Sequence, residues 1–360
     1  MHFTTRFMQN ARFVPGSRPP SAHEPPRFGR ACRKGVTFSR DDGAPYKPAP
    51  QHPPRSAYSV RLQARRRTRK DHAHVSSFKV KTAVQQIMLG TVTGTAERAR
   101  EALRRIRDAG YDGLELNRYM IHPTPAVVRL LTRAAGMPAG NGGRLDWRGL
   151  VGESGLSVVS LHTDLGTLER DPAAIAEEAR DLGTGRVVIT GMYRFEYGSE
   201  QAVRDLAGRL DRAGERLRDA GVELLYHNHN AELAQVRPGV RAYDLLISET
   251  DPALVGFEFD SFWFAAAGAD PAAWMRRLGR RMRLWHVTDR GFRLSGPAMT
   301  PILKADSVEL GRGAMDLDAL REVAVGNGVE AVVLESHRNW VDKDPLKSLE
   351  LSAEWLRERF

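Results

Sequence analysis

VGFEFDSFW, residues 255–263, decides the fold, because it is an apolar run that stops on an acidic side chain, Asp260. Three other runs in the second half of the chain have the same form: LLYHNHN at 224–230, MRLWHVTD at 282–289 and AVVLESH at 331–337. Nearly continuous apolar residues are typical of parallel strands that are buried on both faces. These strands end on His229, Asp260, His286 and Glu335. Such groups bind divalent metals, and their positions at successive strand ends predict that they converge on one point.

The same alternation of apolar strands and amphipathic helices extends from about residue 79 to the C-terminus. It predicts eight strand–helix units, with helices near 95–109, 125–135, 171–182, 199–220, 240–249, 270–278, 315–327 and 345–359, and an inserted loop at 136–144. Asp-Pro pairs are predicted to begin helices, since Asp is a good N-cap and Pro fits the first turn. They stand at Asp171, Asp251, Asp270 and Asp344.

Eight units favour a closed (β/α)₈ TIM barrel over an open, doubly wound sheet. A dinucleotide-binding sheet would carry G-x-G-x-x-G after its first strand. The glycines at 90–94 have the wrong spacing, and the pair at 311 and 313 lacks a third glycine. The predicted organisation is therefore a barrel over 79–360 and a separate N-terminal segment over 1–78.

The N-terminal segment accounts for the basic charge of the chain. The whole chain has a formal charge of +10, but residues 1–78 hold 16 Lys/Arg and 4 Asp/Glu, so that segment carries +12 and the remainder −2. It also contains 10 of the 20 prolines and the run Arg65–Lys70. Low hydrophobicity with high like charge predicts a disordered tail. It is compatible with a leader upstream of the true start, a transit peptide, or a tail that binds nucleic acid or a membrane.

Composition also limits the function of the barrel. A body of −2 charge does not favour binding to nucleic acid. The one cysteine, Cys32, lies in the tail, so no disulfide framework or cysteine zinc site is expected. The sequence has no secretory h-region and no apolar run that would span a bilayer. We therefore expect a cytoplasmic protein without a membrane anchor.

Polar residues at other strand ends are candidates for substrate contact. Glu115 lies on the second strand and His162 on the third, and each either contacts a substrate or binds a neighbouring backbone group. Lys304, in the loop after the seventh strand, is a candidate for reaching an anionic or keto group, although a loop lysine is usually solvated.

Alternation along the fifth and sixth strands leaves a choice of ligand. His227 shares a face with His229, and Glu258 shares a face with Asp260, but only Asp260 lies at its strand end. Glu232 follows shortly after the fifth strand. The position offered by that strand is therefore open between His227, His229 and Glu232.

Several segments together resemble the sugar phosphate isomerase/epimerase family, whose fold is the xylose-isomerase-like TIM barrel. In chain order they are GYDGLELN, GLSVVSLH, LLYHNHNAEL, VGFEFDSFWFAAAGADPAAW, LWHVTDR, VELGRGAMDLDAL and AVVLESHRN. The resemblance implies one divalent metal ion (Mn, Zn, Co or Mg), held by Glu, Asp, His and Glu from strands five to eight. Asp260, His286 and Glu335 match three of those positions, and the fifth strand departs by offering histidine.

A second departure from the family pattern is Trp263, where several relatives carry a histidine that commonly touches substrate. Trp263 is a candidate for an apolar wall against a sugar ring or an aglycone, and the alternative is that it packs in the core. Some barrels of this kind pair, which leaves room for a homo-oligomer.

The chemistry of sugar isomerisation fits these residues. The reaction removes a proton next to a carbonyl, and a metal that binds the carbonyl and hydroxyl oxygens stabilises the enediolate. Glu335 is a candidate for both ligand and base, with His229 or Glu232 as the opposing catalytic group. His227, Glu115, His162, Trp263 and Lys304 are candidates for substrate contact. The predicted activity is a metal-dependent isomerase or epimerase that acts on a keto-sugar or cyclitol.

Three other functions remain open at this point. A lyase, dehydratase or hydrolase would use the same site and the same first step. An endonuclease of the same barrel superfamily would need about three zinc ions, and Trp263 occupies one expected ligand position. A non-catalytic sugar-binding barrel would hold no metal.

Overall fold

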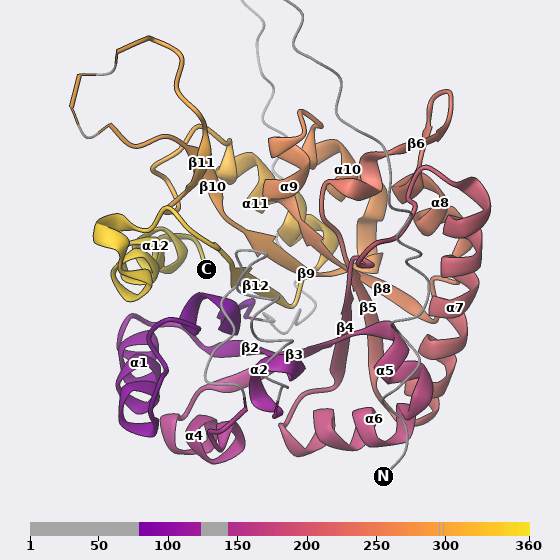
Figure 1. Cartoon of the computed structure of the whole chain (residues 1–360), viewed down its shortest axis with the longest axis horizontal. Helices are drawn as coiled ribbons and strands as arrows, with labels where there is room; N and C mark the ends of the chain where they lie inside the picture. Colours follow the sequence, from indigo (N-terminus) through magenta and orange to yellow (C-terminus); the bar gives the residue numbers. More distant parts are fainter. Residues whose placement is uncertain (1–78, 124–142, 295, 298) are drawn as a thin grey trace, which may run out of the picture. The chain divides into compact units, whose positions relative to one another are not determined.

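The computed structural model describes residues 79–123, 143–294, 296–297 and 299–360. In this part of the chain eight parallel strands form a closed barrel, in the spatial order β1-β12-β9-β8-β5-β4-β3-β2 (Figure 1). Their bounds are β1 Lys81–Gln85, β2 Gly113–Asn117, β3 Ser157–Thr163, β4 Arg186–Thr190, β5 Glu223–His227, β8 Val255–Asp260, β9 Met282–Val287 and β12 Ala331–Leu334. The predicted (β/α)₈ barrel is therefore confirmed.

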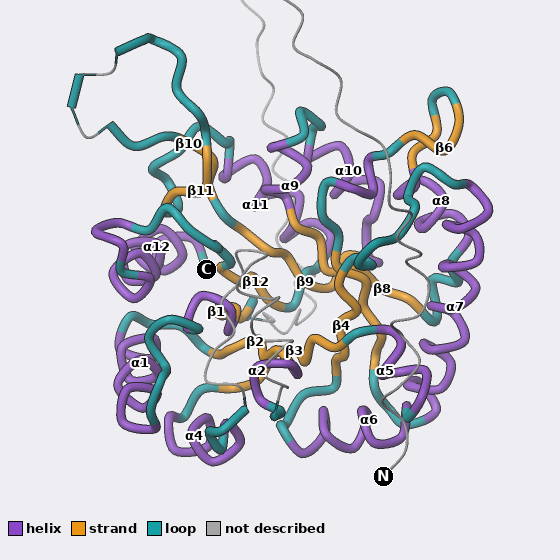
Figure 2. The backbone as a smooth tube through the Cα atoms, viewed as in Figure 1, coloured by secondary structure: helices purple, strands orange, loops and turns teal. Residues whose placement is uncertain are grey.

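Helices surround the strands on the outside of the barrel (Figure 2). Their bounds are α1 Ala96–Asp108, α2 Arg118–Ile121, α4 Trp147–Ser154, α5 Leu165–Arg170, α6 Pro172–Asp181, α7 Glu200–Asp219, α8 Ala242–Glu249, α9 Ser261–Ala266, α10 Pro271–Leu278, α11 Leu317–Asn327 and α12 Pro345–Arg359. None of the helices in the described ranges has the length and apolarity that a membrane crossing needs. The predicted tail at 1–78, the predicted helix at 125–135 and nearly all of the predicted loop at 136–144 lie outside the described residues.

Three of the four Asp-Pro pairs begin helices, as predicted. The side chains of Asp171, Asp270 and Asp344 accept hydrogen bonds from backbone N–H groups in the first turns of α6, α10 and α12, at 2.9–3.0 Å. Each aspartate thus satisfies a backbone donor that the helix itself leaves without a partner.

The fourth pair does not begin a helix, and that prediction is wrong. Asp251 begins a turn in which its side chain accepts from Ala253 N at 2.8 Å and its carbonyl accepts from Val255 N at 3.0 Å. Strand β8 already begins at Val255, so there is no room for a helix. The helix of this unit is α8, which precedes the turn. It begins at Ala242 because the residues before it form a hairpin, β6 Gln235–Arg237 with β7 Val240–Arg241.

Two hydrophobic layers hold the barrel. The larger lies between strands and helices and includes Tyr226, Tyr243, Phe257 and Trp285, all fully buried. The smaller layer is formed by residues from β1, β3, β4, β5, β9 and β12: Ala83, Val159, Val188, Leu225, Leu284, Ala331 and Val333. Small and branched apolar side chains of this kind fill the interior of a TIM barrel.

Four charged residues at or just before the N-terminal ends of the strands form a closed ring of ion pairs. Arg283 lies 2.8 Å from Glu223 and 2.6 Å from Glu330. Arg186 pairs with the same two carboxylates, at 3.4 Å from Glu223 and in close contact with Glu330. Two positive and two negative charges therefore balance one another at this end of the barrel.

Candidate metal centre

Polar side chains continue the inward faces of three strands beyond the apolar layer. Successive side chains of a strand point to opposite faces, so residues two apart share a face. Two residues beyond Leu225, Leu284 and Val333 stand His227, His286 and Glu335. The strand period therefore brings these three groups to the C-terminal end of the barrel, where TIM barrels have their active sites.

Together with Asp260 these residues form a set that we call the outer group: His227, Asp260, His286 and Glu335. One donor atom from each lies within 4.8 Å of the others, and His286 Nδ1 is 2.8 Å from Glu335 Oε2. Two imidazole nitrogens and two carboxylate oxygens suit zinc, manganese or cobalt. The two carboxylates also balance the charge of a divalent ion, so the donor set fits such an ion.

The outer group opens on a cavity of about 270 Å³. Asp260 and Glu335 contribute to its wall, and Trp263 and Phe262 form an aromatic side. The cavity is lined by His229, Asp260, Phe262, Trp263, Thr288, Asp306, Ser307, Glu335, Ser336, His337 and Arg338. A small molecule bound there would therefore have an aromatic wall on one side and the candidate ligands within reach.

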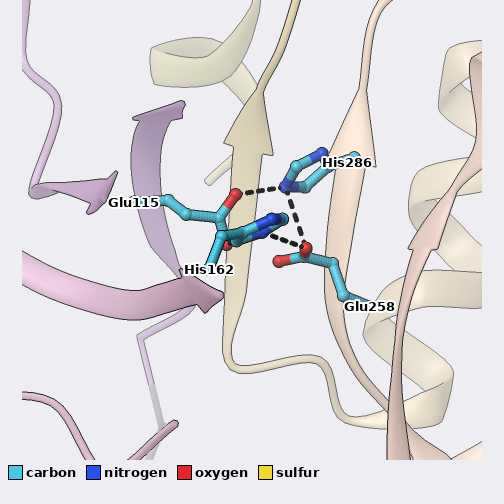
Figure 3. A group of neighbouring side chains, drawn as sticks. All are labelled: Glu115, His162, Glu258 and His286. Atoms are coloured by element: carbon cyan, nitrogen blue, oxygen red, sulfur yellow. Dashed lines mark hydrogen bonds and ion pairs between the residues drawn. The ribbon is translucent and has the colours of Figure 1, made fainter. Parts of the chain in front are cut away.

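A second set, which we call the inner group, shares His286 with the outer group and adds three residues from β2, β3 and β8: Glu115, His162 and Glu258 (Figure 3). His162 Nε2 lies 3.0 Å from Glu115 Oε1 and 2.9 Å from Glu258 Oε2. His286 Nε2 lies 2.6 Å from Glu115 Oε2. None of the three added residues lines the cavity, so the inner group lies behind the candidate ligands.

Glu115 and Glu258 each lie on a strand whose pairing with the next strand is irregular. The register of β2 against β3 shifts between Leu114 and Glu115, and that of β8 against β9 shifts between Phe257 and Glu258. In both places the extra residue lies on the neighbouring strand, Val159 on β3 and Arg283 on β9. Both carboxylates meet imidazoles inside the barrel, and Glu115 also accepts a close hydrogen bond from Ser160.

The buried carboxylates and imidazoles shift one another's pKa values strongly. Burial alone would lower the pKa of His162, but Glu115 and Glu258 raise it to about 10. Burial would raise the pKa of Glu258, but His286 and His162 hold it well below its usual value. The pKa of Asp260 in the outer group is raised to about 6, chiefly by burial. These shifts express the coupling of buried carboxylates and imidazoles within one small volume.

At strand five the geometry favours His227. It is the last residue of β5 and belongs to the outer group, whereas His229 lies beyond the strand and outside that group. His229 instead forms part of the cavity wall, with its ring centroid 5.7 Å from that of Trp263. Burial, with His227 next to it, lowers the pKa of His229 to about 3, so this ring is neutral.

Glu232 is fully buried and lies outside both groups. Its oxygens accept hydrogen bonds from Tyr226 Oη at 2.8 Å and from His229 N at 3.0 Å. A Cβ atom at Gly191 would come within 2.7 Å of this carboxylate, so only glycine fits there without displacement. Glu232 therefore fixes the backbone at His229 rather than facing the cavity.

The other predicted contact residues divide between three places. Trp263 lines the cavity. Glu115 and His162 lie in the inner group and not in the cavity wall. Lys304 is exposed in the segment between β10 Asp289–Gly291 and β11 Asp306–Val308 and does not line the cavity.

Sequence reasoning assigned no role to two residues of the site. Glu258 shares a strand face with Asp260, and this alternation was the available signal. His337 lines the cavity 3.4 Å from Glu335, and its signal was a position two residues after that glutamate. Asp289, which follows β9, binds backbone groups: its oxygens accept from the N–H groups of Arg290, Gly313 and Met315.

Comparisons with known proteins agree with this architecture. A family model described as xylose isomerase-like TIM barrel matches residues 103–359. A sugar phosphate isomerase/epimerase structure from Parabacteroides distasonis ATCC 8503 has a TM-score of 0.61 at 21% identity, covering 79% of this chain and 96% of that one. A xylose isomerase-like TIM barrel protein from Mycobacterium smegmatis, solved in complex with magnesium, has a TM-score of 0.54 at 14% identity, covering 78% and 96%.

Among curated proteins, an inosose dehydratase from Mesomycoplasma hyopneumoniae (strain 7448) is 32% identical over 93 residues, or 26% of this chain. The match spans only 30% of the length of that relative. The family match, in contrast, covers most of the barrel and agrees with its closed eight-stranded topology. The chain therefore belongs to the xylose isomerase-like TIM barrel family.

Proposed function

We propose that this protein is a divalent-metal-dependent enzyme that removes a proton next to the carbonyl of a keto-sugar or cyclitol. The observation that carries the proposal is the outer group, in which His227, Asp260, His286 and Glu335 converge beside a cavity. The cavity of about 270 Å³ is slightly smaller than the range of about 300–1,000 Å³ for sites that hold drug-sized molecules. It therefore suits a single sugar or cyclitol ring.

The residues of this chain would divide the work as follows. His227, Asp260, His286 and Glu335 would hold the ion. When bound, the ion would polarise the carbonyl and hydroxyl oxygens of the substrate. Glu335 and His229 both line the cavity, and we propose that they move the proton on and off carbon. Trp263 would pack against the ring face and exclude water, while Glu232 holds His229 in place through its backbone.

Two outcomes of proton removal are candidates. Return of the proton to carbon gives an isomerase or epimerase. Loss of a hydroxyl group as water gives a dehydratase, and the likeness to an inosose dehydratase favours this second candidate. A cytoplasmic location and assembly into a homo-oligomer stay predictions.

The test of the proposal begins with metal analysis of the purified full-length chain. The protein is then incubated in deuterated water with a panel of keto-sugars and inososes, with and without a chelator. We expect bound metal and chelator-sensitive deuterium incorporation into at least one compound. Exchange without loss of water indicates an isomerase or epimerase, and loss of water indicates a dehydratase. A metal-free protein, or no exchange with any compound, would contradict the proposal.

Metal uptake is expected to release protons near neutral pH. Burial would lower the pKa of His286, but Glu258, Glu115 and Glu335 raise it well above its usual value of 6.5. The ring therefore carries an extra proton in the ion-free protein, and a ligating nitrogen must lose its proton. Affinity for zinc should accordingly tighten as pH rises toward that pKa. Calorimetric titrations in buffers of different ionisation enthalpy measure the release, and heats that do not depend on the buffer would contradict it.

A further inference from the structure

We infer that Glu258 is a positioning residue, a carboxylate behind the outer group that fixes how two candidate ligands, His227 and His286, face the ion. The inference rests on the metal site of the proposed function. Glu258 is fully buried on β8 and does not line the cavity. It therefore acts on a substrate only through the residues it contacts.

A single oxygen of Glu258 meets three imidazoles. Its Oε2 lies 3.2 Å from His227 Nδ1, 3.3 Å from His286 Nε2 and 2.9 Å from His162 Nε2. Figure 3 shows the last two of these contacts. Three rings from β5, β9 and β3 are thus oriented around one acceptor.

The contacts leave the opposite nitrogen of each candidate ligand for the ion. His286 turns Nε2 toward the inner group and Nδ1 toward Glu335, at 2.8 Å. His227 turns Nδ1 toward Glu258, so Nε2 is the nitrogen that remains for the outer group. A carboxylate that accepts from the distal N–H of a ligating histidine fixes its tautomer and ring orientation and makes the ring a better donor.

The two histidines do not depend equally on Glu258. His286 has a second carboxylate at the same nitrogen, Glu115 at 2.6 Å. The His227 ring, in contrast, makes one hydrogen bond within the described residues, and its partner is Glu258. Loss of Glu258 should therefore disturb His227 on β5 more than His286 on β9.

The other oxygen of Glu258 provides a clean substitution. Within the described residues, Oε1 is buried and has no hydrogen-bond partner. A glutamine can place its amide nitrogen there and keep an acceptor in the place of Oε2. Glu258→Gln thus removes the charge with little change in shape, whereas Glu258→Leu fills similar space and removes the acceptor.

A different reading of the inner group makes an opposing prediction. Its four donor atoms also lie within 4.8 Å of one another, so the set could hold an ion of its own. His286 Nε2 would then carry no proton for Glu115, and the two groups would share one ring between two ions. This reading requires two ions per chain, whereas the positioning role requires one.

The experiment measures cobalt(II) binding to the full-length chain by competition with a chelator, together with the visible spectrum of the bound cobalt. Glu258→Gln is expected to weaken cobalt binding about 10-fold and Glu258→Leu about 100-fold, the span typical of such outer carboxylates. Both should change the cobalt absorption bands, because the ring donors shift. The wild type should bind one ion.

The matched control is Glu309→Gln, which alters a buried glutamate that accepts from Arg293 and Ser348 outside the site. Its affinity and spectrum should equal those of the wild type. If Glu258→Leu does not fold, Glu258→Gln carries the test. Unchanged binding and spectrum in a folded Glu258→Gln, or two ions per wild-type chain, would overturn the inference alone. A wild type that binds no ion would overturn the proposed function and the inference together.

Discussion

Asp260→Asn is expected to remove most turnover while leaving the fold intact. The change takes one of two carboxylates from the outer group, and without it the charge of a divalent ion is poorly balanced. A polarising ion is worth several kcal/mol in the transition state, so a loss of about 4 kcal/mol, on the order of 1,000-fold in rate, is expected. Metal content of the purified protein and the rate of deuterium exchange measure the effect.

The fold should survive because Asp260 also caps α9, where its Oδ1 accepts from Trp263 N at 3.1 Å. Asparagine caps helices about as well as aspartate. The control is Asp270→Asn, the same change at the N-cap of α10, where the side chain accepts from Ala272 N at 2.9 Å. That variant should keep its metal and its rate. A metal-loaded, active Asp260→Asn protein would contradict the assignment of this residue.

Phe257→Ala is expected to lower the free energy of unfolding while leaving metal binding intact. Phe257 stands three residues earlier on the same strand but belongs to the layer between strands and helices. Its ring is fully buried against Tyr243, at 5.7 Å between centroids, and beneath the Arg281 guanidinium at 4.8 Å. Truncating a buried phenylalanine costs about 3–5 kcal/mol of unfolding free energy. Urea unfolding measures this loss, and the folded fraction should still bind metal.

The control for this effect is Phe292→Ala, which truncates a ring that is 53% exposed and should cost far less. A loss below about 0.5 kcal/mol for Phe257→Ala, within the range of ordinary surface substitutions, would contradict this packing. A folded variant that fails to bind metal would also contradict it, because the layer between strands and helices would then influence the metal site.

The fold was readable from the sequence because its signal is local. Apolar runs mark each strand, and aspartate-proline pairs mark helix starts at Asp171, Asp270 and Asp344. The same pair at Asp251 misled because a dipeptide does not record how soon the next strand begins. The candidates at the ends of strands six to eight, Asp260, His286 and Glu335, come together as the strand period predicts; their roles as ligands stay predictions.

The rest of the site could not be predicted from the strand period, because it depends on contacts between distant strands and on where each strand ends. The strand period puts Glu258 on the same face as Asp260, but it does not show that Glu115 and Glu258 meet at the His162 ring from two separate strands. The choice at strand five depends on where β5 ends, at His227. The burial of Glu232 depends on its bond with Tyr226 and on the missing side chain at Gly191, which approaches from another strand end.

The ring of Arg186, Glu223, Arg283 and Glu330 lies at the end of the barrel away from the candidate ligands, so changes to stability can be made apart from changes to the site. Thermal tolerance can be adjusted at that end by changing these four charges, whose side chains are 20–35% exposed. The apolar layer, which includes Leu225, Leu284 and Val333, lies between this ring and the ligand end. This barrel is therefore suited to separate redesign of its two ends, with thermal stability changed at the N-terminal ends of the strands and substrate specificity at the C-terminal ends.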